Sequence, residues 1–161
     1  MKPVRFCALA CAVALLVVGV AVPAPVPPAA KETQATELAK LSGIWALASR
    51  QHGGVETVAN QPNARPQFTT FSAEGIVTWS PNDMEFGRVV RMDPSKNPKE
   101  IDYTVSVGPH KGKVQKGIYK FEGDTFTDCC APPGDDRPTE FKSTNENGFE
   151  IMKFQKAKKG E

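Results

Sequence analysis

The sequence lacks the short motifs by which many enzymes are recognised. It contains no Gly-x-Ser-x-Gly turn, no glycine-rich phosphate loop and no His-Glu-x-x-His helix. Its 161 residues include two histidines, His52 and His110, and neither Cys-x-x-Cys nor His-x-x-x-His spacing accompanies them. We therefore predict a protein without an enzymatic site, a cofactor or a bound metal.

A large excess of charge of either sign is also missing. The chain has 20 Lys and Arg against 18 Asp and Glu, and two of the basic residues, Lys2 and Arg5, fall in the leader described next. The rest of the chain is therefore close to neutral, so we expect no broad basic surface for nucleic acid or anionic lipid. The remaining basic cluster lies at the C-terminus and is interpreted as a solvated tail: Lys153, Lys156, Lys158 and Lys159.

Residues 1–30 have the order of regions that is typical of a secretory signal. Lys2 and Arg5 are followed by an almost unbroken apolar run at 6–22 and by a Pro/Ala-rich stretch at 23–30. This order predicts an exported protein, periplasmic or secreted. Because the apolar run is just short of the roughly 20 residues that span a bilayer, an uncleaved N-terminal membrane anchor is the alternative.

Cysteine is scarce after this leader. Cys129 and Cys130 are the two that remain in residues 31–161, and because they are adjacent they cannot form a long-range disulfide with each other. The pair has three interpretations: a strained vicinal disulfide, two thiols on opposite faces of a strand, or a metal or redox site with His52 or His110. A thiol that pairs with another chain is a further option.

Short strand patterns bounded by turns make up the rest of the sequence, with one short helix before them. Residues 31–40 are polar and rich in helix formers, and no second long helix is expected. Residues 100–107 alternate apolar and polar side chains, which predicts a half-buried strand. The other seven principal strands are expected at 44–51, 67–71, 75–80, 84–92, 114–122, 125–130 and 149–155. A further short strand is possible at 55–59, and residues 137–142 are expected to be extended.

Eight principal strands joined by short loops predict a closed, antiparallel, up-and-down barrel, because closure removes the exposed sheet edges. Gly43 and Trp45 open the first strand. In small barrels of the lipocalin type, a Trp in this place plugs one end and the Gly allows a tight bend beside it. Residues 31–161 are thus expected to form one all-β, lipocalin-like domain after a short helix. A sandwich of two sheets is the alternative.

Several segments in this order and spacing carry a resemblance to a known family. They are Leu41-Ser42-Gly43-Ile44-Trp45, Asp93-Pro94 with Pro98-Lys99-Glu100-Ile101-Asp102, residues 117–124, Cys129 and Arg137-Pro138-Thr139-Glu140-Phe141. Over residues 38–156 the chain resembles an uncharacterised lipocalin-like domain family that is expanded in planctomycetes. The resemblance implies a calycin-like barrel and no established activity, so no catalytic residue is transferred. The family pattern usually shows one Cys before its Arg-Pro segment, and this chain shows two.

Trp45 and Arg137 are the candidate pair for closing the barrel. In lipocalin-like barrels a Trp on the first strand often lies under an Arg from the last strand, a cation–π contact worth about 0.5–2 kcal/mol. Arg137 precedes the expected final strand, so we predict this contact and favour a structural role for it over ligand binding.

The expected function is that of an exported binding module that holds a small apolar ligand in the lumen or an envelope protein at the mouth. An eight-stranded barrel has room for its own side chains or for one small ligand. A filled lumen would instead favour a structural or protein-interaction domain that uses loops 53–66 and 131–137, and a metal or redox site is the third option. The candidate cavity residues are Leu47, Trp79, Tyr103, Tyr119 and Phe121.

Overall fold

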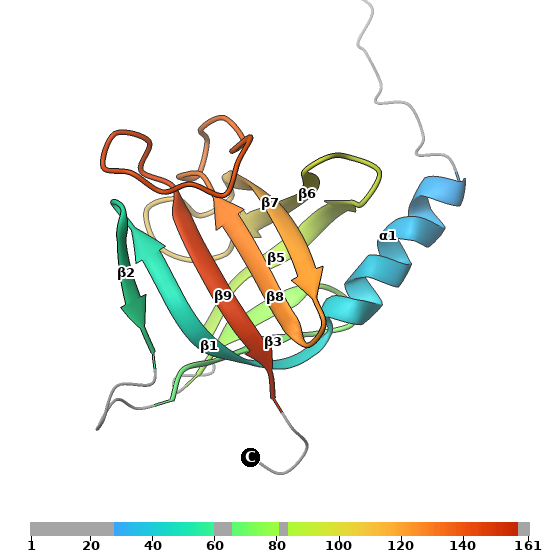
Figure 1. Cartoon of the computed structure of the whole chain (residues 1–161). Helices are drawn as coiled ribbons and strands as arrows, with labels where there is room; N and C mark the ends of the chain where they lie inside the picture. The colour runs from blue at the N-terminus through green and yellow to red at the C-terminus, as the bar shows by residue number, and fades with distance from the viewer. Residues whose placement is uncertain (1–27, 60–65, 81–83, 158–161) are drawn as a thin grey trace, which may run out of the picture.

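The computed structural model describes residues 28–59, 66–80 and 84–157 (Figure 1). The predicted secretory leader, and with it the alternative of a membrane anchor, lies outside the described residues except for 28–30. Within the described ranges, no helix combines the length and the apolar character needed to cross a bilayer.

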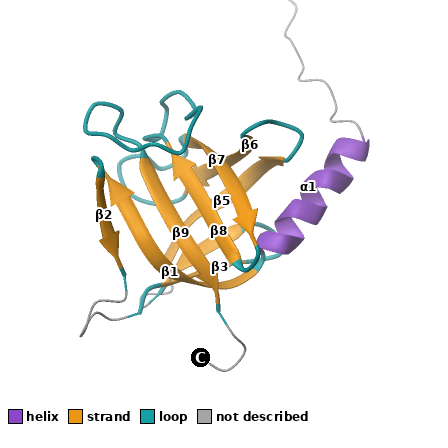
Figure 2. Ribbon diagram, in the orientation of Figure 1, coloured by secondary structure: helices purple, strands orange, loops and turns teal. Residues whose placement is uncertain are grey.

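One antiparallel sheet curls round and closes on itself (Figure 2). Its elements are α1 (Pro28–Leu41), β1 (Gly43–His52), β2 (Val55–Val58), β3 (Phe68–Phe71), β4 (Ile76–Trp79), β5 (Met84–Asp93), β6 (Lys99–Val105), β7 (Val114–Glu122), β8 (Thr125–Cys130) and β9 (Glu150–Lys156). From β3 to β9 each strand pairs with the next, and β1 pairs with both β3 and β9, which completes the circle. The predicted eight-stranded up-and-down barrel with a short N-terminal helix is confirmed, and the two-sheet sandwich is excluded.

The barrel has a base, where α1 joins β1, and an upper end, where β1 turns into β2. At the base the wall is continuous, because the first half of β1, Gly43 to Ala46, pairs with β3. Toward the upper end a β-bulge interrupts the pairing of β1 with β9 after Leu47, and residues Ser49 to His52 pair with β2 instead of β3. The Leu47 N–H still bonds the Gln67 carbonyl oxygen, but beyond it no pairing of β1 with β3 is present among the described residues, and β2 lies along that edge of β1.

Aromatic rings fill the lower half of the lumen. Trp45, Phe121 and Phe126 pack with ring centroids 5.1–6.2 Å apart, and Phe71 and Phe154 join Phe126 at 5.9 Å. Tilted and edge-to-face pairs of this kind stabilise a core beyond the area that they bury. The base of the barrel is therefore a packed core and not a cavity.

The helix α1 runs beside β5 and is attached to the barrel at its C-terminal end (Figure 1). It begins at Pro28, three residues before the helix expected from the sequence. Leu41 is fully buried in the core, and Leu38 packs against it from the helix's preceding turn. Glu37 is also buried, and its partners at the barrel base are described below.

The long connection between β8 and β9, residues 131–149, covers part of the outer face of the barrel. Residues 137–142 were expected to be extended, but they form bends within this connection and no strand. Ile118 and Cys129 face outward from β7 and β8, yet both are buried, and the Cys129 thiol lies 3.8 Å from the carbonyl oxygen of Glu140. The connection thus acts as a second, outer layer over these two strands.

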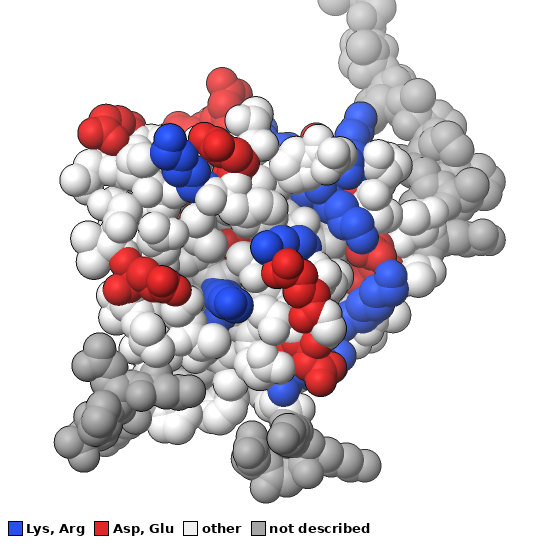
Figure 3. Space-filling view, in the orientation of Figure 1, with Lys and Arg blue, Asp and Glu red and all other residues white. Residues whose placement is uncertain are grey.

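Basic and acidic side chains are interspersed over the face of the molecule that Figure 3 shows. No single-sign field covers that face among the described residues. This distribution agrees with the near-neutral composition of the domain and offers no extended basic track for a polyanion on that face.

Candidate functional site

The base is closed by Trp45. Its indole N–H donates to the Leu41 carbonyl oxygen at 2.6 Å, and the side chain is buried. Gly43 adopts a backbone φ of +122°, a conformation that residues with a side chain rarely adopt, and so allows the chain to turn from α1 into the barrel wall.

The cation over Trp45 is Lys156, not Arg137 as predicted. The Lys156 ammonium lies 5.0 Å from the ring centroid and donates to the Lys40 carbonyl oxygen at 3.2 Å. The sequence pattern misled here because β9 is the strand adjacent to the start of β1, and Trp45 pairs with Lys156 in that register. Lys156 is therefore part of the closed base and not of a solvated tail.

Arg137 lies instead against the outer face of β6 and β7. It donates to the carbonyl oxygens of Ile101 at 3.1 Å and Gly117 at 2.6 Å, and its guanidinium lies 2.7 Å from an Asp102 carboxylate oxygen. Arg91 also pairs with Asp102, at 3.5 Å. The connection after β8 passes outside the barrel, so Arg137 attaches that connection to the outer face of β6 and β7. It cannot reach the Trp45 indole inside the barrel.

Tyr119 and Phe121 belong to the base and do not line a cavity, contrary to expectation. The Tyr119 hydroxyl donates to the Glu37 carboxylate at 2.7 Å, and Phe121 packs on Trp45. Burial by itself would raise the pKa of Glu37, but hydrogen bonds from Lys40 and Tyr119 outweigh it, and the pKa lies below its usual value. The base therefore pairs its buried acid with two donors.

An inner cavity of about 20 Å³ remains above this packed base. That volume is enough for about one water-sized group. Tyr103, Asp128 and Cys130 form its polar side, and Trp79 and Met152 are among its apolar walls. Of the residues expected to line a cavity, Tyr103 and Trp79 do so here.

Asp128 is the buried polar centre of the inner cavity. Its Oδ2 accepts a hydrogen bond from the Tyr103 hydroxyl at 2.9 Å and lies 3.8 Å from the Cys130 thiol. Its Oδ1 has no hydrogen-bond partner among the described residues, although the side chain is about 1 % exposed. A buried polar atom without a partner is rare in folded proteins and calls for an explanation.

Burial raises the pKa of Asp128 to about 7, and the nearby Glu150 carboxylate contributes to the rise. Burial also raises the pKa values of Tyr103 and Cys130 well above their ordinary ranges, and the Asp128 charge adds to both shifts. Near neutral pH the phenol and the thiol are therefore uncharged donors, while Asp128 titrates.

A mouth pocket of about 60 Å³ shares lining residues with the inner cavity and lies beside β1, near the point where β1 begins to pair with β2. Leu47, the remaining residue expected to line a cavity, belongs to it together with Arg50, which forms an ion pair with Glu150. Four side chains line both spaces: Thr69, Trp79, Met152 and Phe154. The two spaces are thus neighbours in the upper lumen.

The two thiols do not form a disulfide. Cys130 faces the lumen and Cys129 faces the outer connection, which is the opposite-face arrangement considered from the sequence. Both are buried, and burial raises the pKa of Cys129 to about 11, so neither thiol is placed for pairing with another chain.

The metal or redox arrangement with histidine is not formed. His52 and Cys130 lie two strands apart, with Glu150 between them in the register, and both His52 and His110 are exposed at hairpin turns. Within residues 28–59, 66–80 and 84–157, no group of three or more His, Cys, Asp or Glu could hold a metal ion.

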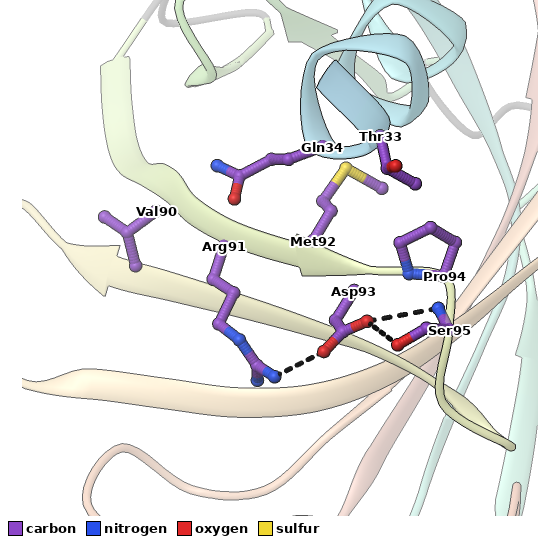
Figure 4. A pocket seen from close by; sticks show the side chains of 8 residues that line it. All are labelled: Thr33, Gln34, Val90, Arg91, Met92, Asp93, Pro94 and Ser95. Atoms are coloured by element: carbon purple, nitrogen blue, oxygen red, sulfur yellow. Dashed lines mark hydrogen bonds and ion pairs between the residues drawn. The ribbon is translucent and has the colours of Figure 1, made fainter. Parts of the chain in front are cut away.

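A larger groove of about 350 Å³ runs between α1 and β5 (Figure 4). Asp93 accepts hydrogen bonds there from Arg91 at 2.8 Å and from the backbone and hydroxyl of Ser95 at 3.1 and 2.5 Å. Its charged groups thus satisfy one another. Among the described residues, the lining of the groove contains no buried polar atom without a partner, whereas the smaller inner cavity contains Asp128 Oδ1.

Sequence reasoning did not select Asp128. The available signal was its position in β8, where Phe126, Asp128 and Cys130 share one face of the strand. An acid two residues after an inward Phe on the same strand is expected to place its carboxylate inside the barrel.

Comparisons with protein-family models, with curated proteins and with solved structures find no match. The resemblance to the planctomycete lipocalin-like family therefore stays a prediction.

Proposed function

We propose that this protein is a non-catalytic binding module, exported to the cell envelope or beyond, that holds a small and mainly apolar ligand in the upper lumen. The ligand enters through the mouth pocket and reaches the inner cavity between Trp79 and Met152. The observation that carries the proposal is the buried Asp128 Oδ1 atom, which has no hydrogen-bond partner among the described residues and belongs to a cavity that shares four lining residues with the mouth pocket.

The size of the two spaces limits the ligand to a small head group with a short apolar tail. Met152 has a flexible, unbranched side chain, and Trp79 is half-buried, so both can move aside more easily than the rings of the base. An apolar pocket with few, well-placed polar groups is the common form of a small-molecule site.

The chain has two tryptophans, which provide an internal control for a binding experiment. Trp79 lines the proposed site, and Trp45 lies in the packed base. We expect 1-propanol, titrated into 15N-labelled protein purified from its own host, to shift the Trp79 indole N–H resonance and leave that of Trp45 in place. Equal shifts, or none, would contradict a site in the upper lumen.

A matched pair of substitutions on β9 tests the same site by filling it. Met152→Trp places a larger side chain at the shared wall, so we expect it to abolish the 1-propanol shift. Lys153→Trp changes the neighbouring exposed residue and should leave the shift intact. Native mass spectrometry of the host-purified protein would then identify any molecule that is retained.

A protein-interaction or structural role is the second candidate. The observation in its favour is the extent of side-chain filling, because aromatic rings occupy the base and leave about 20 Å³ in the inner cavity. This role would use the loops at the upper end, including 131–137, toward an envelope protein. A Trp79 resonance that does not shift with 1-propanol, together with a native mass equal to that of the bare polypeptide, would favour this second role.

A further inference from the structure

We propose that the upper lumen selects a small primary amine, whose ammonium group pairs with Asp128 Oδ1 in the inner cavity while its apolar tail occupies the mouth pocket. This inference rests on the proposed function and adds the chemical class of the ligand. Three features of the cavity point to it: the state of the carboxylate, the chemistry of the walls, and the size of the two spaces.

The carboxylate has a donor on one oxygen and none on the other. Oδ2 is engaged by the Tyr103 hydroxyl, with the Cys130 thiol nearby, and both groups are neutral. Oδ1 has no partner among the described residues. A buried charge is stabilised most by an opposite charge that also donates a hydrogen bond, which an ammonium group does and a neutral hydroxyl does only in part.

The cavity walls favour a cation and disfavour an anion. None of the described residues that line the inner cavity is Lys, Arg or His, so Asp128 meets no basic side chain there. Trp79 and Phe86 stack at 5.2 Å between centroids, and Tyr103 and Phe154 add further aromatic surface. Aromatic faces attract cations through their quadrupole, and a desolvated site strengthens that attraction.

The dimensions suit a primary amine with a short chain. About 20 Å³ in the inner cavity accepts a head group of the size of water, which an ammonium group matches. The adjoining mouth pocket of about 60 Å³ receives the tail. Arg50 lines this pocket, but its ion pair with Glu150 offsets its charge toward an incoming cation.

Binding of an amine requires the ionised form of Asp128, so its affinity rises with pH through the range in which this group titrates. The titratable groups near Asp128 are Tyr103 from β6, Cys130 from β8 and Glu150 from β9, together with Tyr119, which lies opposite Asp128 on β7 but donates its hydroxyl to Glu37. The lining residues from β3, β4 and β5 carry no titratable group. Tyr103 and Cys130 stay neutral near pH 7 because their pKa values are raised. Asp128 is therefore the group that governs this dependence.

The test compares three probes of nearly equal size: 1-propylamine, 1-propanol and propionate. Each is titrated into the 15N-labelled, host-purified protein at pH 6 and pH 8 while the Trp79 indole resonance is followed. At pH 8 we expect propylamine to bind about tenfold or more tightly than propanol, and propionate not to bind. At pH 6 this preference should shrink severalfold, because Asp128 is then mostly protonated.

Asp128→Asn removes the charge and keeps the shape. We expect it to lose the preference for propylamine while it retains propanol binding. Glu37→Gln changes the buried acid of the base and should leave the preference intact. If the Asp128 variant does not fold, the pH dependence of the wild-type preference for propylamine over propanol still tests the amine inference.

The outcomes separate the two proposals. Propanol and propylamine that bind equally at both pH values, with Trp79 shifted, would overturn the amine inference and leave a binding site in the upper lumen. A preference for propionate would overturn it as well. If no probe shifts Trp79, both the amine inference and the proposed function fail.

Discussion

The base and the upper end of the barrel are built from the same strands, and each contains a buried acid. At the base, Glu37 receives hydrogen bonds from Lys40 at 2.6 Å and Tyr119 at 2.7 Å, and the Lys99 ammonium lies 3.5 Å away. At the upper end, Asp128 is engaged by a phenol and a thiol through one oxygen.

The comparison shows that the charge of the partners, and not burial alone, decides how a buried acid behaves. Burial opposes ionisation in both cases, yet the pKa of Glu37 is lowered and that of Asp128 is raised. At the base, cationic partners stabilise the ionised form of Glu37, so its charge needs no further partner. None of the described residues that line the inner cavity is a cation, and this is the property expected of a site that binds a cationic ligand.

The largest test of this difference compares the two tryptophans. Trp45→Ala removes a fully buried ring and its hydrogen bond to Leu41, so we expect a loss of about 3–5 kcal/mol in the free energy of unfolding. Trp79→Ala removes a half-buried ring at the mouth and should cost about half of that or less. Urea unfolding of both variants measures the two values. Equal losses would show that the upper end is packed as firmly as the base.

The pH dependence of stability should have opposite signs at the two ends. The raised pKa of Asp128 means that the folded state binds more protons than the unfolded state between about pH 4 and pH 7. Its contribution is therefore complete at low pH and is lost as pH rises through about 7, on the order of 3–5 kcal/mol. Asp128→Asn should remove this decline, as urea midpoints measured from pH 4 to pH 8 would show.

The lowered pKa of Glu37 gives the reverse behaviour. Its contribution is present above the ordinary pKa of a glutamate and is lost as pH falls through the lowered value. Glu37→Gln should therefore be less stable than the wild type at pH 7, and the difference should vanish in acid. A Glu37 variant whose deficit grows in acid would contradict the assignment of the paired acid to the base.

The smallest expected effect concerns the cation over the base. Lys156→Met removes the contact with the Trp45 ring and the hydrogen bond to Lys40, so we expect a loss of about 0.5–1 kcal/mol. Lys153→Met, at an exposed position on the same strand, is the control and should change stability by less than the error of a thermal melt. If both variants behave alike, Lys156 is a surface lysine with no part in closing the base.

Much of the fold could be read from the sequence because strand patterns are local. Each of the eight principal strands lies within two residues of its expected bounds, and the optional strand at 55–59 is β2. Alternation within 100–107 and the turns at Gly108 and Gly123 depend on neighbours along the chain alone. The segment 137–142, expected to be extended, forms bends because the outer connection makes its contacts through side chains such as Arg137.

The site was harder to predict because it depends on how the strands are staggered. Tyr103 and Tyr119 looked equivalent in the sequence, as inward aromatic residues on β6 and β7. The stagger of the strands places Tyr119 at the base beside Glu37 and Tyr103 in the upper cavity beside Asp128. Periodicity reports which face a residue occupies, but not its height in the barrel.

The amino-acid sequence by itself determined the number, order and inward faces of the strands and the place of Trp45 at the start of the wall, since these follow from local alternation and turn chemistry. Tertiary structure alone decided that Lys156 covers that indole, that rings fill the base, and that one oxygen of Asp128 has no partner among the described residues. The physical reason is that each of these depends on atoms far apart in the chain, which meet only when the sheet closes with a particular stagger.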